Sequence, residues 1–413
     1  MNFQVSLLYI DPGTGSMLFS LVVGIAAALT FGVRALAVKL KFIMSGGKAE
    51  KTAGETSLPF VIFSDHKRYW PMFKPLCDEA ERRELPFVYY TASPDDPALS
   101  EPYRYVKCKF IGEGNKPFVT LNFLNADVLV STTPGLDVYQ WKRSPDVAYY
   151  VHVPHSVDEL AGYRMFGLDY YDAVLTSGKC QNDFIRTIES LRPGIAKKEL
   201  LTVGSLPLDV LKAKYDANTS REKNAKTVVL VAPSWGPSAL LSKYGAKLLE
   251  ALAQTDFEII VRPHPQTLVS EQAVLKPLTE KFSEFEWNYD NDNFAVLDKA
   301  DILITDFSGI IFDYALVFGK PVIYSINDFD TAVYDADWLD KPKWSIQILP
   351  ALGIELNSAE FGKIGEVINE AISSDVLKSG REKILAECWS NVGNSASCIV
   401  DYLVQKQKIV STK

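Results

Sequence analysis

The sequence predicts an α/β protein with two Rossmann-like lobes that face each other across a cleft. At 413 residues the chain is too long for one ordinary core, and this length favours two globular units. From Leu58 onward, short apolar runs alternate with amphipathic stretches, which is typical of βα units around a parallel sheet. A polar stretch without apolar periodicity, residues 216–226, divides two such series and is predicted to be the connector between the lobes.

The first lobe is expected to span residues 58–215. A helix is predicted at 181–191, where apolar residues recur at three- and four-residue spacing. The apolar runs predict strands at 60–64, 87–91, 126–131, 147–153, 173–177 and 200–203.

The second lobe is expected to span residues 227–375. The last segment, 376–413, has a helical pattern and is expected to fold back and brace the two lobes. The predicted strands and helices of this lobe are strands 227–232, 258–261, 302–305 and 321–324, and helices near 244–253, 309–318 and 360–372.

The N-terminal segment, residues 1–44, is predicted to be a membrane anchor. The uncharged run from Pro12 to Val33 would span about 33 Å as a helix, and we place the transmembrane helix at about 13–37. Basic residues follow this run and none precedes it, so the catalytic part is expected in the cytoplasm of a single-pass plasma (inner) membrane protein. A cleaved secretory signal would need a basic start and a shorter apolar stretch. A polar linker, 45–57, follows.

Charge and cysteine content exclude several classes of partner. The formal net charge of −8 provides no basic field for nucleic-acid phosphates, so we expect no nucleic-acid partner. The five cysteines form no CxxC pair and are expected to be free thiols in a reducing compartment. No His/Cys/Asp cluster has structural-zinc spacing, so no metal is predicted.

Two histidines end the predicted strand at 147–153. Ligands bind at the carboxyl ends of strands in open α/β sheets, so this loop is a candidate site. A histidine there can take a proton from an attacking hydroxyl group. His155 lies past Pro154 in the loop and is the better placed base, whereas His152, within the strand, is equally consistent with a hydrogen-bonded core residue.

The run Arg262-Pro-His264-Pro follows the strand at 258–261. The two prolines fix the backbone around His264, and Arg262 carries a planar cation suited to phosphate oxygens. The alternative is a rigid surface turn with an incidental histidine.

A strand, a polar turn and a helix are predicted around residues 301–314. Ser308 is a suitable N-cap and Gly309 allows close backbone approach, so free amides at a positive helix end can receive a phosphate. Asp306 lies in the same turn, and Asp313 lies about one turn into the helix, where its carboxylate can accept hydrogen bonds from a ribose or another hydroxyl group. The alternative is an ordinary capped helix. The small residues around Ser234, after the first strand of the second lobe, are a further candidate for close phosphate approach, although a plain turn explains the glycine and prolines there equally well.

Three motifs resemble one enzyme family. They are Thr305-Asp-Phe-Ser-Gly-Ile-Ile-Phe-Asp-Tyr-Ala leading to Gly319-Lys-Pro-Val-Ile-Tyr, then Arg262-Pro-His-Pro, and the glycine, proline and aspartate element from Val203 to Asp209. Over most of residues 145–375 the chain resembles the CDP-glycerol glycerophosphotransferases, which build teichoic-acid-like poly(alditol phosphate) chains. The resemblance implies a GT-B fold and metal-independent transfer in the interlobe cleft, with a CDP-alditol as donor substrate and no cofactor. The first lobe, 58–215, would bind the acceptor, and the second lobe, 227–375, would bind the donor nucleotide.

The resemblance also implies roles for individual residues. His155 would be the acceptor base, Arg262 and His264 would steady the donor diphosphate, Ser308 and Gly309 would hold phosphate, and Asp313 would contact the donor. The family shows a Trp-His-Gly-Thr-Pro run where this chain has His152-Val-Pro-His155-Ser, so either histidine can be the counterpart. Gly309 stands where the family has a second serine.

The expected function is transfer of glycerol phosphate, or a related alditol phosphate, to a hydroxyl of a lipid-linked or glycan acceptor at the membrane, in cell-envelope polymer synthesis. One alternative with the same fold is a UDP-sugar-dependent glycosyltransferase or epimerase. The other is a catalytically inactive membrane adaptor that keeps the fold for binding alone. The sequence does not specify the alditol, the acceptor, the number of units added or the oligomeric state.

Overall fold

The computed structural model describes residues 57–412, except 159, 162, 164, 220–223, 291 and 327–341. The expected membrane anchor, including the helix at about 13–37, lies outside the described residues. Among those that are described, no helix is both long and apolar enough to cross a bilayer. Residues from Leu58 onward form one compact unit.

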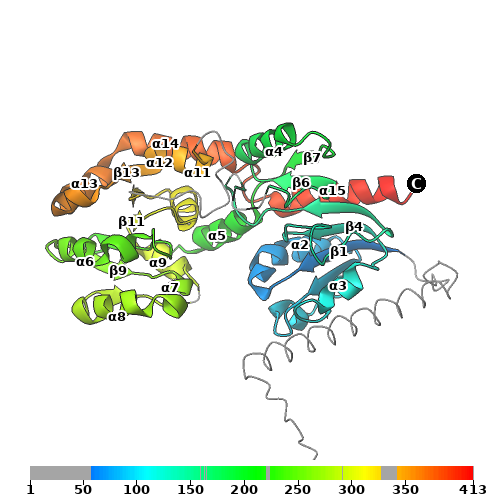
Figure 1. The fold of residues 1–413 in the computed structure, drawn as a ribbon, viewed down its shortest axis with the longest axis horizontal. Helices are drawn as coiled ribbons and strands as arrows, with labels where there is room; N and C mark the ends of the chain where they lie inside the picture. The colour runs from blue at the N-terminus through cyan, green and yellow to red at the C-terminus, as the bar shows by residue number, and fades with distance from the viewer. Residues whose placement is uncertain are drawn as a thin grey trace, which may run out of the picture. The chain divides into compact units, whose positions relative to one another are not determined.

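The first lobe contains a seven-stranded sheet whose strand pairs are all parallel (Figure 1). The strand order is β3-β2-β1-β4-β5-β6-β7. The strands are β1 (Leu58–Ser64), β2 (Phe87–Thr91), β3 (Lys107–Phe110), β4 (Ala126–Ser131), β5 (Val147–His152), β6 (Ala173–Thr176) and β7 (Glu199–Thr202).

The second lobe contains a six-stranded sheet, also with parallel pairs, in the order β10-β9-β8-β11-β12-β13. The strands are β8 (Val228–Val231), β9 (Glu258–Val261), β10 (Glu286–Trp287), β11 (Ile302–Thr305), β12 (Val322–Tyr324) and β13 (Gly353–Glu355). Two parallel sheets joined by βα units confirm the predicted α/β class.

Helices connect the strands in both lobes. Those of the first lobe are η1 (Lys67–Tyr69), α2 (Trp70–Arg82), η2 (Pro97–Ser100), α3 (Lys116–Leu121), α4 (Lys179–Leu191) and α5 (Leu206–Ala217). Those after β8 are α6 (Leu240–Leu252), α7 (Pro265–Ser270), α8 (Gln272–Lys281), α9 (Phe294–Lys299), α10 (Ile310–Phe312), the π-helical turn η3 (Asp313–Val317), α11 (Trp344–Gln347), α12 (Leu349–Leu352), η5 (Ser358–Lys363), α13 (Ile364–Ser373), α14 (Asp375–Cys388) and α15 (Ser395–Val410).

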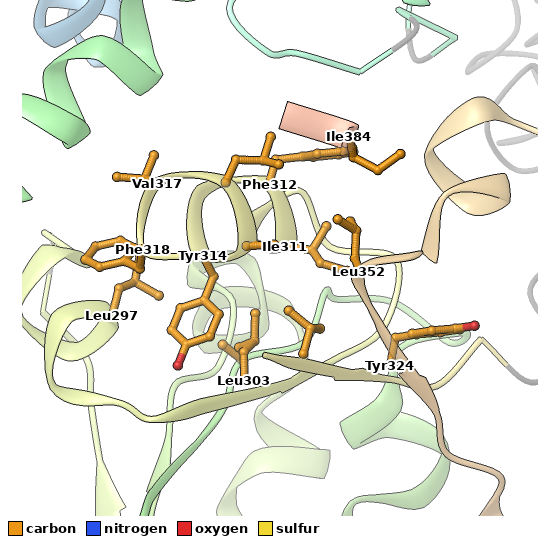
Figure 2. Packing of buried hydrophobic residues seen from close by; sticks show 14 of the residues in the cluster. Leu297, Leu303, Ile311, Phe312, Tyr314, Val317, Phe318, Tyr324, Leu352 and Ile384 are labelled. Carbon is orange, nitrogen blue, oxygen red and sulfur yellow. The ribbon is translucent and has the colours of Figure 1, made fainter. Parts of the chain in front are cut away.

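The central strands are buried along their whole length because helices cover both sheet faces. All four residues of β8 and all four of β11 are buried, which explains their continuous apolar sequence. One core of the second lobe forms around η3 (Figure 2). There Tyr314 is fully buried and donates its hydroxyl hydrogen bond to the carbonyl of Ala300 at 3.0 Å.

The C-terminal helix α15 belongs to the core of the first lobe. It packs against α2 and β4 (Figure 1, red), and Ile399, Val400 and Leu403 are buried in the same cluster as Phe73. Because α14 belongs to the second-lobe core through Ile384 and α15 belongs to the first-lobe core, the end of the chain connects the two lobes.

Candidate active site

Loops at the carboxyl ends of the second-lobe strands line a cavity of about 770 Å³, which we call the interlobe cavity. Its opposite wall comes from α5 and from Pro71 at the start of α2. Five of the residues expected to act in the site line this cavity together: Arg262, His264, Ser308, Gly309 and Asp313. The position agrees with the rule that ligands bind beyond strand carboxyl ends.

Arg262 is held by neighbouring groups in a fixed orientation. Its guanidinium donates to Asn288 Oδ1 and, at 2.8 Å, to the carbonyl oxygen of Asp290. Burial lowers the pKa of Arg262, while the charges of Asp290 and Asp292 raise it. The side chain remains a cation at any physiological pH because the arginine pKa is so high. A fixed cation on the cavity wall suits a diphosphate.

His264 caps helix α7 with its own ring. Nδ1 accepts a hydrogen bond from the backbone N–H of Gln266 at 3.1 Å. Burial lowers the pKa of His264, so the ring is neutral near pH 7. A neutral ring whose Nδ1 accepts must carry its proton on Nε2. His264 therefore presents a hydrogen-bond donor, and not a base, to a ligand. Its ring lies 6.3 Å from that of Trp235, centroid to centroid.

The turn after β11 differs from the capped helix that the sequence predicts. Gly309 is the capping residue of α10, which has only three residues before the π-helical turn begins at Asp313. The backbone N–H of Ser308 donates to Asp306 Oδ1 at 3.2 Å. The first amide of the turn is thus already paired, so a phosphate contact must use the Ser308 hydroxyl and the amides that follow it.

Asp306 and Ser234 lie behind the cavity wall. Asp306 is fully buried, and its two oxygens accept from the backbone amides of Ser234 at 2.8 Å and Leu240 at 2.9 Å, in addition to Ser308. Neither Asp306 nor Ser234 is among the cavity-lining residues. Backbone amides contact both carboxylate oxygens of Asp306, and its expected phosphate contact stays a prediction. Asp306 thus links the loop that contains Ser234 to the turn that contains Ser308.

Asp313 lines the interlobe cavity at the first position of η3. Desolvation raises the pKa of this carboxyl to about 7. A carboxyl group in such a setting is protonated part of the time at neutral pH and can then donate a hydrogen bond. π-Helical turns occur frequently at functional sites, which agrees with this position.

The two candidate histidines of the first lobe have different surroundings. His152 is fully buried in β5, and burial lowers its pKa to about 3, with the charge of His155 as a smaller cause. Its Nε2 lies 3.2 Å from the hydroxyl of Tyr163, while Nδ1 has no partner among the described residues. A ring so enclosed cannot reach a substrate.

His155 lies half-buried in the loop that follows β5. Its Nδ1 is 3.2 Å from Thr132 Oγ1 and 3.3 Å from the Tyr163 hydroxyl. Burial lowers its pKa, whereas the nearby carboxylates of Asp158 and Asp65 raise it. The ring is thus neutral near pH 7 and able to accept a proton.

Tyr69 and Tyr163 were not among the residues that sequence reasoning selected. The Tyr69 ring lies 5.2 Å from the His155 ring, centroid to centroid. Tyr69 ends η1, and Pro71, two residues later, lines the interlobe cavity. His155 does not itself line the interlobe cavity. The segment 69–71 therefore links the His155 ring, which Tyr69 contacts, to the cavity wall, which Pro71 lines. In the part of the chain that the structure describes, no group of three or more His, Cys, Asp or Glu side chains is arranged to hold a metal ion.

Comparison with known proteins gives three kinds of match. A family model described as CDP-Glycerol:Poly(glycerophosphate) glycerophosphotransferase matches residues 135–337. The minor teichoic acid biosynthesis protein GgaB of Bacillus subtilis (strain 168) is 27% identical over 141 residues, which is 33% of this chain. The match covers 14% of GgaB, so this chain corresponds to a small part of that relative's length.

Solved structures show the same fold at low identity. A structure of the wall teichoic acid polymerase TagF, soaked with CDPG, has a TM-score of 0.54 at 16% identity and covers 86% of this chain and 90% of that chain. The UDP-GlcNAc 2-epimerase of Neisseria meningitidis, bound to UDP-GlcNAc, has a TM-score of 0.54 at 14% identity and covers 84% and 99%. These likenesses establish the fold, with the two facing Rossmann-like lobes of the GT-B type.

Proposed function

We propose that this chain transfers an alditol phosphate from a CDP-activated donor, because a family model described as CDP-Glycerol:Poly(glycerophosphate) glycerophosphotransferase matches residues 135–337. Glycerol phosphate is the proposed unit, and a hydroxyl group of a membrane-linked acceptor is the proposed recipient. The product belongs to a cell-envelope polymer of the teichoic-acid type. We place the reaction at the cytoplasmic face of the plasma membrane.

One observation carries the proposal. Arg262, His264, Ser308, Gly309 and Asp313 come from loops up to about fifty positions apart in the chain, yet they line one cavity. The cavity offers a fixed cation, a neutral N–H donor and the start of a helical turn, which are groups that bind a diphosphate. A volume of about 770 Å³ lies within the range of small-molecule sites.

His155 is the proposed acceptor base. His152 is enclosed in the sheet and has a pKa of about 3. We therefore propose His155, in the loop, as the base. Thr132 or Tyr163 can accept a hydrogen bond from His155 Nδ1–H, which leaves Nε2 unprotonated.

The proposed reaction is a displacement at the β-phosphorus of the donor. The acceptor hydroxyl gives its proton to His155 Nε2, and its oxygen forms a new bond to the β-phosphorus. The bond between that phosphorus and the oxygen bridging to the α-phosphate breaks, and CMP leaves with the electron pair. Arg262 and the Nε2–H of His264 stabilise the negative charge on the departing CMP.

Release of CMP tests the proposal. We would incubate the purified full-length chain with CDP-glycerol or CDP-ribitol and a bacterial lipid extract, and measure CMP. The expected result is release with at least one donor, abolished in His155→Ala and His264→Ala while the far-UV circular dichroism stays unchanged. Full activity in both variants would refute the assigned roles.

The fold likeness to a UDP-GlcNAc 2-epimerase favours a second candidate function, that of an enzyme acting on a UDP-sugar. Thermal shift with CDP-glycerol, UDP-glucose and UDP-N-acetylglucosamine separates the two, because a ligand that binds the folded state raises its melting temperature. A shift specific to the CDP compound supports the glycerophosphotransferase. A shift specific to UDP compounds favours the epimerase or glycosyltransferase, and no shift with any nucleotide favours a binding-only protein.

A further inference from the structure

The buried histidine of β5, His152, is a polar side chain that the proposed reaction does not use. Its ring is fully buried, with Nε2 3.2 Å from the hydroxyl oxygen of Tyr163 and Nδ1 without a partner among the described residues. An apolar residue would fill this position without the cost of desolvating two ring nitrogens. The contact with Tyr163 is therefore what a histidine adds at this position of the strand.

The Tyr163 hydroxyl lies between His152 and His155. Its oxygen is 3.2 Å from His152 Nε2 and 3.3 Å from His155 Nδ1. A phenol hydroxyl carries one proton and two acceptor lone pairs, so it can bond to His152 and still accept a hydrogen bond from His155 Nδ1–H. The His152 and Tyr163 rings meet edge to face, with centroids 5.4 Å apart and planes at 83°, which fixes the phenol against the end of β5.

Two other neighbours fix the His155 ring. Thr132 Oγ1 lies 3.2 Å from Nδ1, and the Tyr69 ring lies 5.2 Å from the imidazole, centroid to centroid. Thr132 follows β4, which pairs with β5 in the sheet. Two oxygen atoms thus face Nδ1 of His155. A proton on Nδ1 finds an acceptor there, and Nε2 is the nitrogen left to receive a proton.

The hydrogen bonds around Tyr163 orient the base and do not carry its proton away. Burial lowers the pKa of His152 to about 3 and raises the pKa of Tyr163. At neutral pH the first is therefore a neutral imidazole and the second a neutral phenol. Neither takes up the proton that His155 receives from the acceptor hydroxyl. What these contacts can do is select the tautomer of His155, because the hydrogen bond at one ring nitrogen decides where the proton lies.

We propose that His152 and Tyr163 are positioning residues for the acceptor base: His152 holds the Tyr163 hydroxyl, which accepts a hydrogen bond from His155 Nδ1–H and so keeps Nε2 unprotonated. This inference rests on the proposed transfer, to which it adds the groups that prepare the base. It gives the two histidines of the strand end different tasks, since His155 meets the acceptor hydroxyl and His152 acts through Tyr163.

Kinetics of CMP release test the positioning role. Tyr163→Phe removes only the hydroxyl and should lower kcat roughly 10- to 100-fold, because the base loses its tautomer and orientation, while the KM for CDP-glycerol stays unchanged. His152→Leu should cause a similar loss, and His152→Gln, whose amide can replace Nε2, should recover most of it. In the Tyr163→Phe background His152→Leu should cause no further loss, since both residues act through one contact.

Tyr171 provides the matched control. Its ring also packs on that of His152, with centroids 5.0 Å apart, but its hydroxyl donates to the carbonyl of Thr133 at 2.5 Å. Tyr171→Phe should leave kcat unchanged. An unchanged kcat in Tyr163→Phe, an equal loss in Tyr171→Phe, or additive losses in the double variant would overturn the inference.

The position of the proton on His155 can be measured without substrate. The chain has four histidines, so ¹⁵N-histidine NMR of the full-length chain in lipid nanodiscs resolves each ring, assigned from the variant that lacks it. We expect the His155 proton on Nδ1, and a shift toward Nε2 in Tyr163→Phe and His152→Leu. A proton on Nε2 in the parent protein, or no change in Tyr163→Phe, would also overturn the inference. Tyr163→Phe decides the outcome even where His152→Leu does not fold. Absence of CMP release by the parent protein would refute the proposed transfer, whereas the NMR result would stand by itself.

Discussion

At the residue scale, His264 combines a structural and a chemical contact in one ring. Nδ1 caps α7 and Nε2–H is left for the ligand. His264→Ala should lose the cap, at about 1 kcal/mol of stability, and also lower kcat/KM by about 10²- to 10³-fold. Asparagine is a good N-cap, so His264→Asn should recover the stability without recovering the activity. Urea unfolding and CMP release measure the two effects.

The control for this prediction is His66, which caps η1 in the same way by accepting from the backbone N–H of Arg68 at 3.1 Å. His66 is exposed and does not line the interlobe cavity. His66→Asn should leave the KM for CDP-glycerol unchanged. If His264→Asn is fully active, the ring has only its capping role.

The carboxyl group of Asp313, which lines the interlobe cavity, has a pKa of about 7. Its folded-state pKa of about 7 lies above the ordinary 3.8, so its contribution to stability is complete below pH 3.8 and is lost as the pH rises through 7. Between these values the loss is at most about 1.4 kcal/mol per pH unit. Asp313→Asn should remove this slope. The free energy of unfolding of both proteins, measured by urea titration from pH 4 to 9, tests it; parallel pH curves would contradict the shifted pKa.

The residues that line the interlobe cavity have a local signal in the sequence, whereas the tyrosines beside His155 have none. Arg262 and His264 directly follow a strand, and strand order places such loops at one edge of the sheet. Tyr69 and Tyr163 are distant in sequence from Thr132, and nothing in their local pattern indicates contact with His155. Their role depends on how separate segments pack, which a single sequence does not express.

At the element scale, burial decides which strands the sequence reveals. The apolar runs of β1 and β8 are visible because these strands are central and covered on both faces. The apolar pattern does not predict β3, β10 and β13, which are edge strands and have only four, two and three residues. β3 is largely exposed and contains two lysines, so it carries no apolar signal.

The carboxylate of Asp209, in α5, accepts three hydrogen bonds from residues between the end of α14 and the start of α15. It accepts from Trp389 Nε1 at 2.9 Å and from the backbone amides of Gly393 at 2.8 Å and Ser395 at 2.9 Å. Asp209→Ala leaves these donors without their acceptor, one of them on the fully buried Trp389, and should destabilise the protein by about 3 kcal/mol. Urea unfolding measures the loss.

Asp216, near the end of the same helix, is the matched control. Its carboxylate pairs with Lys212 at 2.8 Å, but the Asp216 side chain is exposed and that of Lys212 is 35% exposed. An exposed i,i+4 ion pair contributes only about 0.3–0.5 kcal/mol, so Asp216→Ala should cost far less than Asp209→Ala. Equal losses in the two variants would show that the Asp209 contacts add nothing beyond an ordinary surface pair.

At the scale of the whole molecule, the return of the chain from α14 to α15 determines how the lobes are joined. The backbone N–H of Ser390 donates to the carbonyl of Ser177 at 2.9 Å, and the side-chain Nδ2 of Asn391 donates to the carbonyl of Thr202 at 3.2 Å. Helical periodicity predicts that this segment is helical. It does not predict the partner, because both acceptors are backbone carbonyls, which every residue type carries.

Two glycines allow this return segment to lie directly on the first lobe. A Cβ at Gly178 would stand 2.4 Å from the carbonyl oxygen of Glu387, and one at Gly204 would stand 2.3 Å from that of Ser390. Both contacts are with backbone, which cannot rotate away, and Gly204 also has a φ of +104°. The close approach of α4 and β7 to the C-terminal segment thus requires glycine at both positions.

Replacing either glycine with alanine should therefore weaken the packing of the segment between α14 and α15 against the first lobe. Gly178→Ala is expected to cost about 1–3 kcal/mol through overpacking, and Gly204→Ala more because its backbone conformation is also strained. Gly362→Ala, where an added Cβ meets nothing within 4 Å, is the control and should stay within about 0.5 kcal/mol of the parent protein. Urea unfolding gives the free energies, and hydrogen exchange locates the change. Faster exchange in α15 in the first two variants would show that the return segment has detached, whereas unchanged exchange and stability in both would mean that the chain ends do not hold the lobes together.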